Sequence, residues 1–209
     1  ATRWHLPENT VRARQVLYPY VRNATERQPV DLADYPCARA YLLKHRERLE
    51  SRSYVTGAGR RWYEVWVPHR PSDWTHPKLA FPDISESNKF FLADPGWIVN
   101  GDCYWTKLLP GKDWSWLMLM LAVANSSFAL TFYDTVFHNK LYSGRRRFMS
   151  QYVSRFPLPK MTRAQGVVDF MPSVLAAARR ENSLELARLE RDLDALVWEA
   201  FGLSKEVAR

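Results

Sequence analysis

Strand-like and helical patterns occupy different parts of this chain, and this separation constrains its fold more than any other feature. Three short apolar runs, KLAFPDIS, KFFLADPG and GWIVNGDCYWTKLL, follow one another along the sequence. Turn formers at Asp94 to Gly96 and at Asn100 to Asp102 predict a meander of two hairpins from Leu79 to Leu108. Two helices are then expected, Trp114 to Asn125 and Phe128 to Phe137. The predicted fold class is α+β, with a strand-rich mixed sheet body, packed helices and a C-terminal antiparallel helix pair.

The C-terminal helix pair is predicted from a regular apolar stripe. Residues spaced alternately three and four apart form the seam of a coiled coil or helix hairpin: Leu186, Leu189, Leu193, Leu196 and Ala200. Asn182 and Glu185 are set for a capping box at its start, and Gly202 for the C-cap. Because residues 167–178 carry a similar stripe, we expect two antiparallel helices joined near residues 181–183.

The N-terminal third combines short alternating runs with one helical stretch. The run RQVLYPYVRN alternates as a strand does. A helix with Pro36 in its first turn is predicted to open at Asp34 or Tyr35. Its apolar positions recur at helical spacing: Ala38, Tyr41, Leu42, His45 and Leu49.

Eight aromatic residues fall in or near the alternating runs: Trp62, Tyr63, Trp66, Phe90, Phe91, Trp97, Tyr104 and Trp105. One interpretation is a stacking platform for the bases of a single strand. Alternation within strands favours core packing instead.

Composition excludes several classes of protein. With 209 residues, 46% of them hydrophobic and 14% aromatic, the chain is not generally disordered. The longest apolar run, Trp114 to Ala124, is about half of the roughly 20 residues that a membrane span needs, so no membrane partner is expected. Cys37 and Cys103 are too few, and the five histidines too scattered, for a metal site. We expect free thiols in a reducing, cytoplasmic compartment. The first residue is Ala and no signal sequence follows, which indicates a processed or excised piece.

Positive charge is concentrated in the body of the chain. Its net charge is +8. Seven Lys and Arg residues lie between Lys140 and Arg163 with no Asp or Glu among them, and residues 39–70 carry eight against three. From Arg179 onward, six Lys and Arg face seven Asp and Glu. The aromatics interleaved with Arg145 to Arg147 make this segment a candidate surface for phosphate.

Six ordered motifs carry a resemblance to a known family. They are YPCARAYLLKHRERLESR, RWYEVWVPHRP, KLAFPDISESNKFFLADPGWIVNGDCYWTKL, LAVANSSFALTFYDTV, RRRFMSQYVSRFPLP and LERDLDALVWEAFGLS. Over residues 35–204 the chain resembles the C-terminal specificity domain of the TaqI-like and Eco57I-like adenine-N6 DNA methyltransferases, a group that includes type IIG restriction-modification polypeptides.

The resemblance implies a target-recognition domain that reads double-stranded DNA for a catalytic domain lying upstream in the same polypeptide. S-adenosylmethionine would be the cofactor of that parent protein, and this fragment would hold no cofactor and no catalytic residue. We expect residues 1–160 to form the DNA-recognition body. Residues 161–209 would form a helical hairpin that packs on the body or on the catalytic domain, and the chain would be a monomer.

A reader of duplex DNA needs cations for phosphates and side chains that pair with base edges. Such residues occur together in predicted loops, and the candidate DNA-binding set is Arg60, Arg61, Ser85, Ser87, Asn88, Lys89, Asn139, Lys140, Tyr142, Arg145, Arg146, Arg147 and Gln151. A plain solvated turn is the alternative for Arg145 to Arg147. A capped turn is the alternative for Ser87 to Lys89, and a mobile loop for Arg60 and Arg61.

Motifs for catalysis are missing from the sequence. Asp94-Pro95-Gly96-Trp97 has only a superficial likeness to the motif with which amino-methyltransferases hold the target amine, and no glycine-rich turn for S-adenosylmethionine occurs. There is also no G-x-S-x-G, P-loop or HExxH motif. The alternatives left open are half of a separate restriction-system specificity subunit, a methyltransferase active alone, and a basic protein-interaction module.

Overall fold

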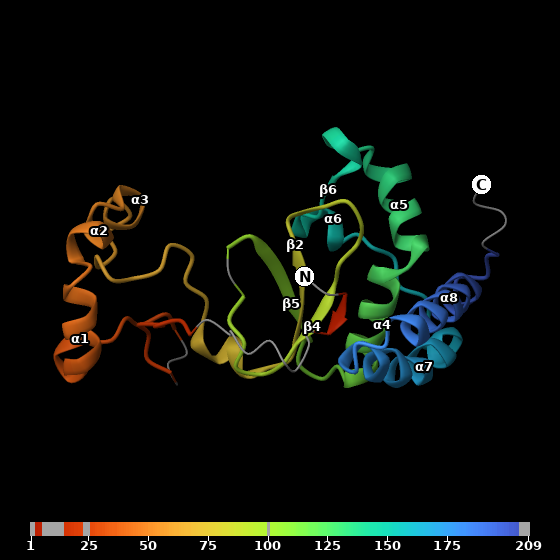
Figure 1. The fold of residues 1–209 in the computed structure, drawn as a ribbon, viewed down its shortest axis with the longest axis horizontal. Helices are drawn as coiled ribbons and strands as arrows, with labels where there is room; N and C mark the ends of the chain where they lie inside the picture. The colour runs from red at the N-terminus through yellow and green to blue at the C-terminus, as the bar shows by residue number, and fades with distance from the viewer. Residues whose placement is uncertain (1–2, 6–14, 23–25, 100, 205–209) are drawn as a thin grey trace. The chain divides into compact units, whose positions relative to one another are not determined.

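A computed structural model describes residues 3–5, 15–22, 26–99 and 101–204 (Figure 1). The chain divides into two compact units. The larger unit comprises residues 1–11, 77–95 and 99–209, and the smaller unit residues 12–76 and 96–98. The main sheet and the C-terminal helices belong to the same unit. The fold class is α+β, as predicted.

The main sheet of the larger unit has four strands in the order β1-β4-β2-β5. The strands are β1 (Trp4–His5), β2 (Lys78–Pro82), β4 (Phe91–Ala93) and β5 (Cys103–Lys107). Strand β2 pairs antiparallel with both β4 and β5, and β1 pairs parallel with β4. The predicted meander is therefore wrong in its order, because β4 and β5 flank β2 and do not pair with each other. The first four residues of β2 are buried, which suits a central strand.

A second, two-stranded sheet joins β3 (Ile84–Ser85) to β6 (Arg146–Arg147). The residue after β6, Phe148, is only 1% exposed and contacts the rings of Phe90 and Tyr133. Residues 150–153 form a short helix, α6 (Ser150–Val153). Phe148 thus anchors the arginine-bearing strand to the core.

Helices α4 (Trp114–Asn125) and α5 (Ser127–Phe137) match the two predicted helices to within a residue. Asp113 caps α4 by accepting from the N–H of Ser115, and the Ser126 hydroxyl caps α5 by accepting from Ala129. Over the described residues, no single helix is long and apolar enough to cross a membrane. The two helices reach that length and composition only together, and they are bent by 66° where they meet.

The predicted C-terminal helix pair is confirmed as α7 (Met161–Arg179) and α8 (Ser183–Ala200). The Asn182 side chain accepts from the N–H of Glu185, which is the N-cap half of the predicted capping box. The Glu185 carboxylate accepts from the Asn182 side-chain amide, and the backbone N–H of Asn182 donates to the carbonyl of Ala177. Gly202 follows α8 with φ of +74°, a conformation that favours glycine. Helix α7 packs on α4 as well as on α8, so the pair covers the core of the larger unit.

The smaller unit is built from short elements: η1 (Leu32–Asp34), α1 (Pro36–Leu43), α2 (Arg46–Glu50), α3 (Ser53–Thr56) and η2 (Pro71–Thr75). The single helix expected from residue 35 to 49 is broken between α1 and α2. Tyr63, Phe90 and Phe91 are buried as predicted, whereas Trp66 is 50% exposed because residues 62–67 form no strand.

Candidate nucleic-acid interface

The α5–β6 loop, defined here as residues 138–145, is the most exposed part of the candidate site. It turns sharply: His138, Ser143 and Gly144 all have positive φ. The N–H of Leu141 donates to the carbonyl of Arg145 at 2.8 Å and closes the loop on itself. Tyr142, at the turn, is 80% exposed. The loop therefore presents an aromatic side chain from a closed backbone.

Asp134 of α5 holds the base of this loop. Its carboxylate accepts two hydrogen bonds of 2.7 Å from Arg146 and contacts Lys140 at 2.9 Å. These bonds, that from Arg146 first, lower the pKa of Asp134 below its ordinary value. Arg146 also donates to the carbonyl of Glu86 at 2.7 Å, and only 11% of its side chain is exposed. Arg146, which was predicted as a DNA contact, thus acts as a structural clamp at the base of the loop.

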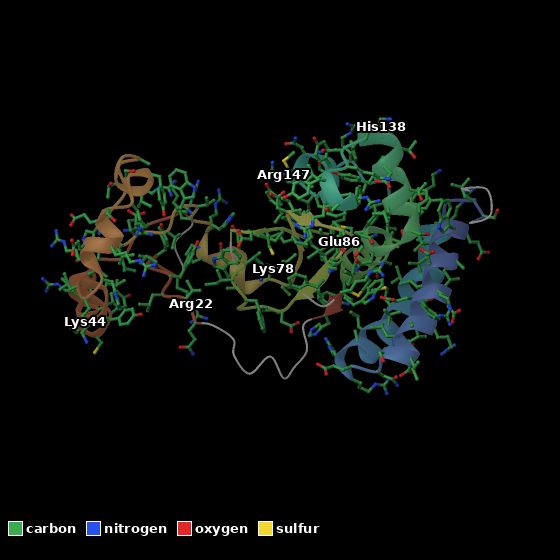
Figure 2. The ribbon with its side chains drawn as sticks, turned by 45° about the horizontal axis from the view of Figure 1, so that its top comes forward. Arg22, Lys44, Lys78, Glu86, His138 and Arg147 are labelled. Carbon is green, nitrogen blue, oxygen red and sulfur yellow. The ribbon has the colours of Figure 1, made fainter. Side chains whose placement is uncertain are left out.

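The other two arginines of the cluster remain accessible. Arg147 pairs with Asp83 at 3.1 Å and Arg145 approaches Glu86 at 3.9 Å, with 47% and 46% of their side chains exposed. Figure 2 places Arg147 and Glu86 on this part of the larger unit. Carboxylates from outside the basic segment thus form ion pairs with its arginines. The net charge of this surface is therefore less positive than the sequence of the segment alone indicates. Both pairs are exposed, and exposed pairs exchange partners at little cost.

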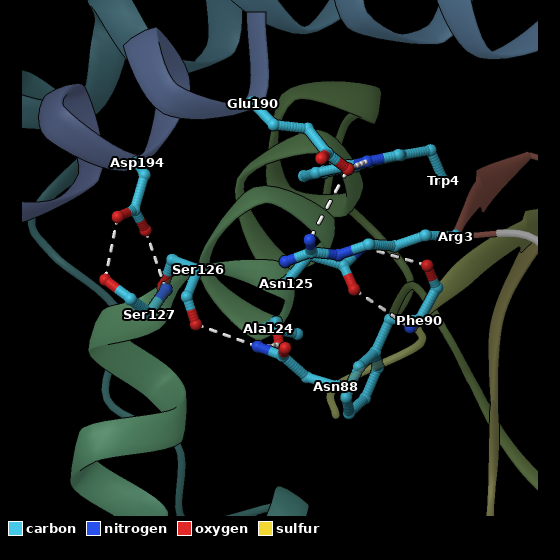
Figure 3. A network of polar contacts seen from close by, with 10 residues as sticks. All are labelled: Arg3, Trp4, Asn88, Phe90, Ala124, Asn125, Ser126, Ser127, Glu190 and Asp194. Atoms are coloured by element: carbon cyan, nitrogen blue, oxygen red, sulfur yellow. Dashed lines mark hydrogen bonds and ion pairs between the residues drawn. The ribbon is translucent and has the colours of Figure 1, made fainter. Parts of the chain in front are cut away.

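Asn88 and Ser85 lie in the interior. Asn88 is 4% exposed, and its amide donates to the carbonyls of Ala124 and Ser126 at 2.8 Å each (Figure 3). Ser85 is 8% exposed. Both were predicted as DNA contacts, and both are buried: Asn88 ties the segment before β4 to the α4–α5 junction.

The remaining candidates of the larger unit lie at its surface to different degrees. Ser87, Lys89 and Asn139 are half-buried, and Gln151 is exposed. Lys89 makes no ion pair with any residue that the structure describes. Lys89 and Gln151 are therefore free to approach a phosphate or a base edge.

Arg60 and Arg61 belong to the smaller unit. Arg60 donates to the carbonyls of Val65 and Trp66. Arg61 donates to the carbonyl of Val30 at 3.1 Å and to the hydroxyl of Tyr63 at 2.7 Å. Both arginines hold the unit's own loops together, which argues against the alternative of a mobile loop.

Sequence reasoning missed the three carboxylates, Asp83, Glu86 and Asp134. A signal existed for Asp134, because it is the only charged residue in the apolar helix SFALTFYDTVF. A carboxylate in such a helix requires a cationic partner.

A second polar network ties the N-terminal strand to α8 (Figure 3). Arg3 and the Trp4 indole both contact the carboxylate of Glu190, and Asp194 accepts from the N–H and hydroxyl of Ser127. A cavity of about 300 Å³ opens beside it. Among the described residues, no group of three or more His, Cys, Asp or Glu is placed to hold a metal ion.

Comparison with known proteins finds similarity to Type II methyltransferases. It is 35% identical over 207 residues, 98% of its length, to Type II methyltransferase M.BanIII of Aneurinibacillus aneurinilyticus, and covers 35% of that protein. It is 28% identical over 180 residues to Type II methyltransferase M.PaeR7I of Pseudomonas aeruginosa, 85% of the chain and 28% of that protein. No known protein-family profile matches it.

The chain is therefore related to these Type II methyltransferases. It spans about a third of the length of these relatives.

Proposed function

We propose that this chain is the sequence-specific DNA-recognition domain of an adenine-N6 modification methylase. The observation that carries the proposal is that nearly the whole chain matches about a third of a Type II methyltransferase. The chain itself contains no glycine-rich cofactor motif. Catalysis and S-adenosylmethionine binding would belong to an upstream domain of the same polypeptide.

The α5–β6 loop and its clamp suit this role. Arg145 and Arg147 are half-exposed, and a DNA phosphate can displace the carboxylates of Glu86 and Asp83 with which they pair. Tyr142 and Asn139 lie on a loop closed at its base, so little conformational entropy is lost when they contact bases. Phosphate contacts would set the register of the protein, and the loop would read base edges.

The first test measures binding of the chain to duplex DNA by fluorescence anisotropy over a range of salt concentrations. Wild-type affinity is expected to fall steeply with salt, because phosphate contacts release counterions. Arg145→Ala with Arg147→Ala should weaken binding about tenfold and reduce the salt slope by about two. Asp83→Asn with Glu86→Gln should act in the opposite direction, because it frees the same two guanidinium groups.

Arg188→Ala is the matched control. This arginine is also exposed and paired with a carboxylate, but it lies on α8. It should leave the affinity within about twofold of the wild type. If the loop double variant keeps the wild-type affinity and salt slope, the α5–β6 surface is not the DNA interface.

The second test concerns the cofactor. The isolated chain should show no heat of binding with S-adenosylmethionine by titration calorimetry, because a backbone cradle for the cofactor has no residues here. Saturable binding would make the chain a methyltransferase in its own right. The modified base is identified by nucleoside mass spectrometry of DNA methylated by the full-length protein, in which N6-methyladenine is expected.

A further inference from the structure

The smaller unit carries most of the excess positive charge. It contains twelve Lys and Arg residues against seven Asp and Glu, which gives a net charge of +5. The net charge of the whole chain is +8, and the smaller unit makes up about a third of its length. Two of those carboxylates are already engaged. Glu64 is buried and accepts from the Tyr20 hydroxyl and the N–H of Arg61, and Glu50 pairs with Arg46. The field that this unit presents to a partner is therefore cationic.

Helix α1 buries none of its eight residues, whereas every other described α-helix of eight or more residues buries at least two. Only Ala38 and Leu42 are half-buried, and the other six side chains are exposed. Tyr41 is 54% exposed and Leu43 is 43% exposed. An amphipathic helix normally buries one stripe, so a helix that exposes large side chains in this way is expected to have a partner outside the chain.

The chemistry of α1 and α2 favours duplex DNA as that partner. Arg39, Lys44 and Arg48 are exposed and make no ion pair within the described part of the chain. Ala40 lies between Arg39 and Lys44 and leaves room for the helix backbone to approach a ligand closely. A helix with its side chains is about 10–12 Å across, which fits a major groove about 12 Å wide.

From the exposed helix, its cations and its small central residue, we infer that α1 enters the major groove of duplex DNA. Arg39 would contact base edges, Lys44 would contact the phosphate backbone, and the remaining cations of α2 would lie along the adjacent strand. This inference rests on the proposed function and extends it to the smaller unit, as a second contact separate from the α5–β6 loop. The alternative partner for this basic surface is an acidic protein, which would show no preference for one groove of a DNA duplex.

Cys37, exposed in the first turn of α1, provides a direct test. Duplexes are prepared with an activated disulfide tether either on cytosine N4, in the major groove, or on guanine N2, in the minor groove. The full chain should form a disulfide with the major-groove tether at least about fivefold faster. Cys37→Ser should abolish the product, whereas Cys103→Ser should not, because Cys103 is half-buried on β5 and burial raises its thiol pKa. Equal trapping in both grooves, or none, overturns the inference.

Arg39→Ala with Lys44→Ala tests the energetic contribution. Both side chains are exposed, so the melting temperature should stay within about 2 °C of the wild type. DNA affinity should fall about tenfold and the salt slope by about two. If only the α5–β6 loop variants weaken binding, the inference on α1 fails while the proposed function stands. If the wild-type chain binds no duplex at all, both fail.

Discussion

Replacing Asn88 with Asp is expected to lower the free energy of unfolding by at least about 3 kcal/mol. The wild-type amide donates to two carbonyl oxygens, those of Ala124 and Ser126, at 2.8 Å each in a site that is 4% exposed. A carboxylate would place negative charge against both oxygens. Asn88→Ala removes the donors without adding charge and should cost about 2 kcal/mol.

The measurement is urea unfolding followed by circular dichroism, with the neighbouring Lys89→Ala as the matched control. Lys89 is half-buried and makes no ion pair among the described residues, so its substitution should change stability by less than about 0.5 kcal/mol. The effects on DNA affinity should be the reverse of those on stability. Lys89→Ala should weaken DNA binding, whereas Asn88→Ala, where it folds, should leave the affinity unchanged. If Asn88→Ala is stable but binds DNA more weakly than the wild type, Asn88 is a DNA contact and not a structural residue.

Breaking the clamp between Arg146 and Asp134 is the second large expected effect. Arg146→Ala should lower the free energy of unfolding by about 2–3 kcal/mol, because it leaves a mostly buried carboxylate with Lys140 as its remaining cationic partner among the described residues. Arg147→Ala is the matched control. Its side chain is 47% exposed, so water screens its pair with Asp83 and the stability loss should be much smaller. Equal losses for the two variants would contradict the clamp.

The clamp also predicts a dependence on pH. Hydrogen bonds from Arg146 and Lys140 lower the folded-state pKa of Asp134 below its ordinary value of 3.8. A carboxyl group with a lowered folded pKa stabilises the fold fully above its unfolded pKa, and this contribution is lost as pH falls from about 4 through the folded pKa. Asp134→Asn should therefore flatten this part of the stability curve. An unchanged acid limb in urea unfolding between pH 2 and 6 would show that Asp134 contributes nothing there.

DNA affinity offers a qualitative check on the same clamp. Asp134→Asn and Asp83→Asn each remove one negative charge near the arginine cluster, so a purely electrostatic surface would bind DNA more tightly in both cases. If Asp134 acts by ordering the α5–β6 loop, its substitution should weaken binding while Asp83→Asn strengthens it. Changes in DNA affinity of opposite sign for the two variants would show that Asp134 acts by ordering the loop and not through its charge alone.

Much of the helical structure was predictable because its signals are local. The Leu189 to Ala200 stripe, the Asn182 and Glu185 capping box and the left-handed Gly202 each depend on residues within a turn of one another. The same holds for α4 and α5, which begin at the capping residues Asp113 and Ser126. The strand order was not predictable in this way, because turn formers indicate where a chain reverses but not which strand becomes central.

For the candidate site, the amino-acid sequence was sufficient to locate the basic α5–β6 segment and its arginines, since composition is a local property. It did not reveal that Asp134 and Asp83 oppose Arg146 and Arg147, or that Asn88 is turned inward to the α4–α5 junction. Those roles depend on contacts between residues up to 64 positions apart. Such contacts form only when folding brings distant segments together. They decide whether an arginine is available to DNA or supports the loop.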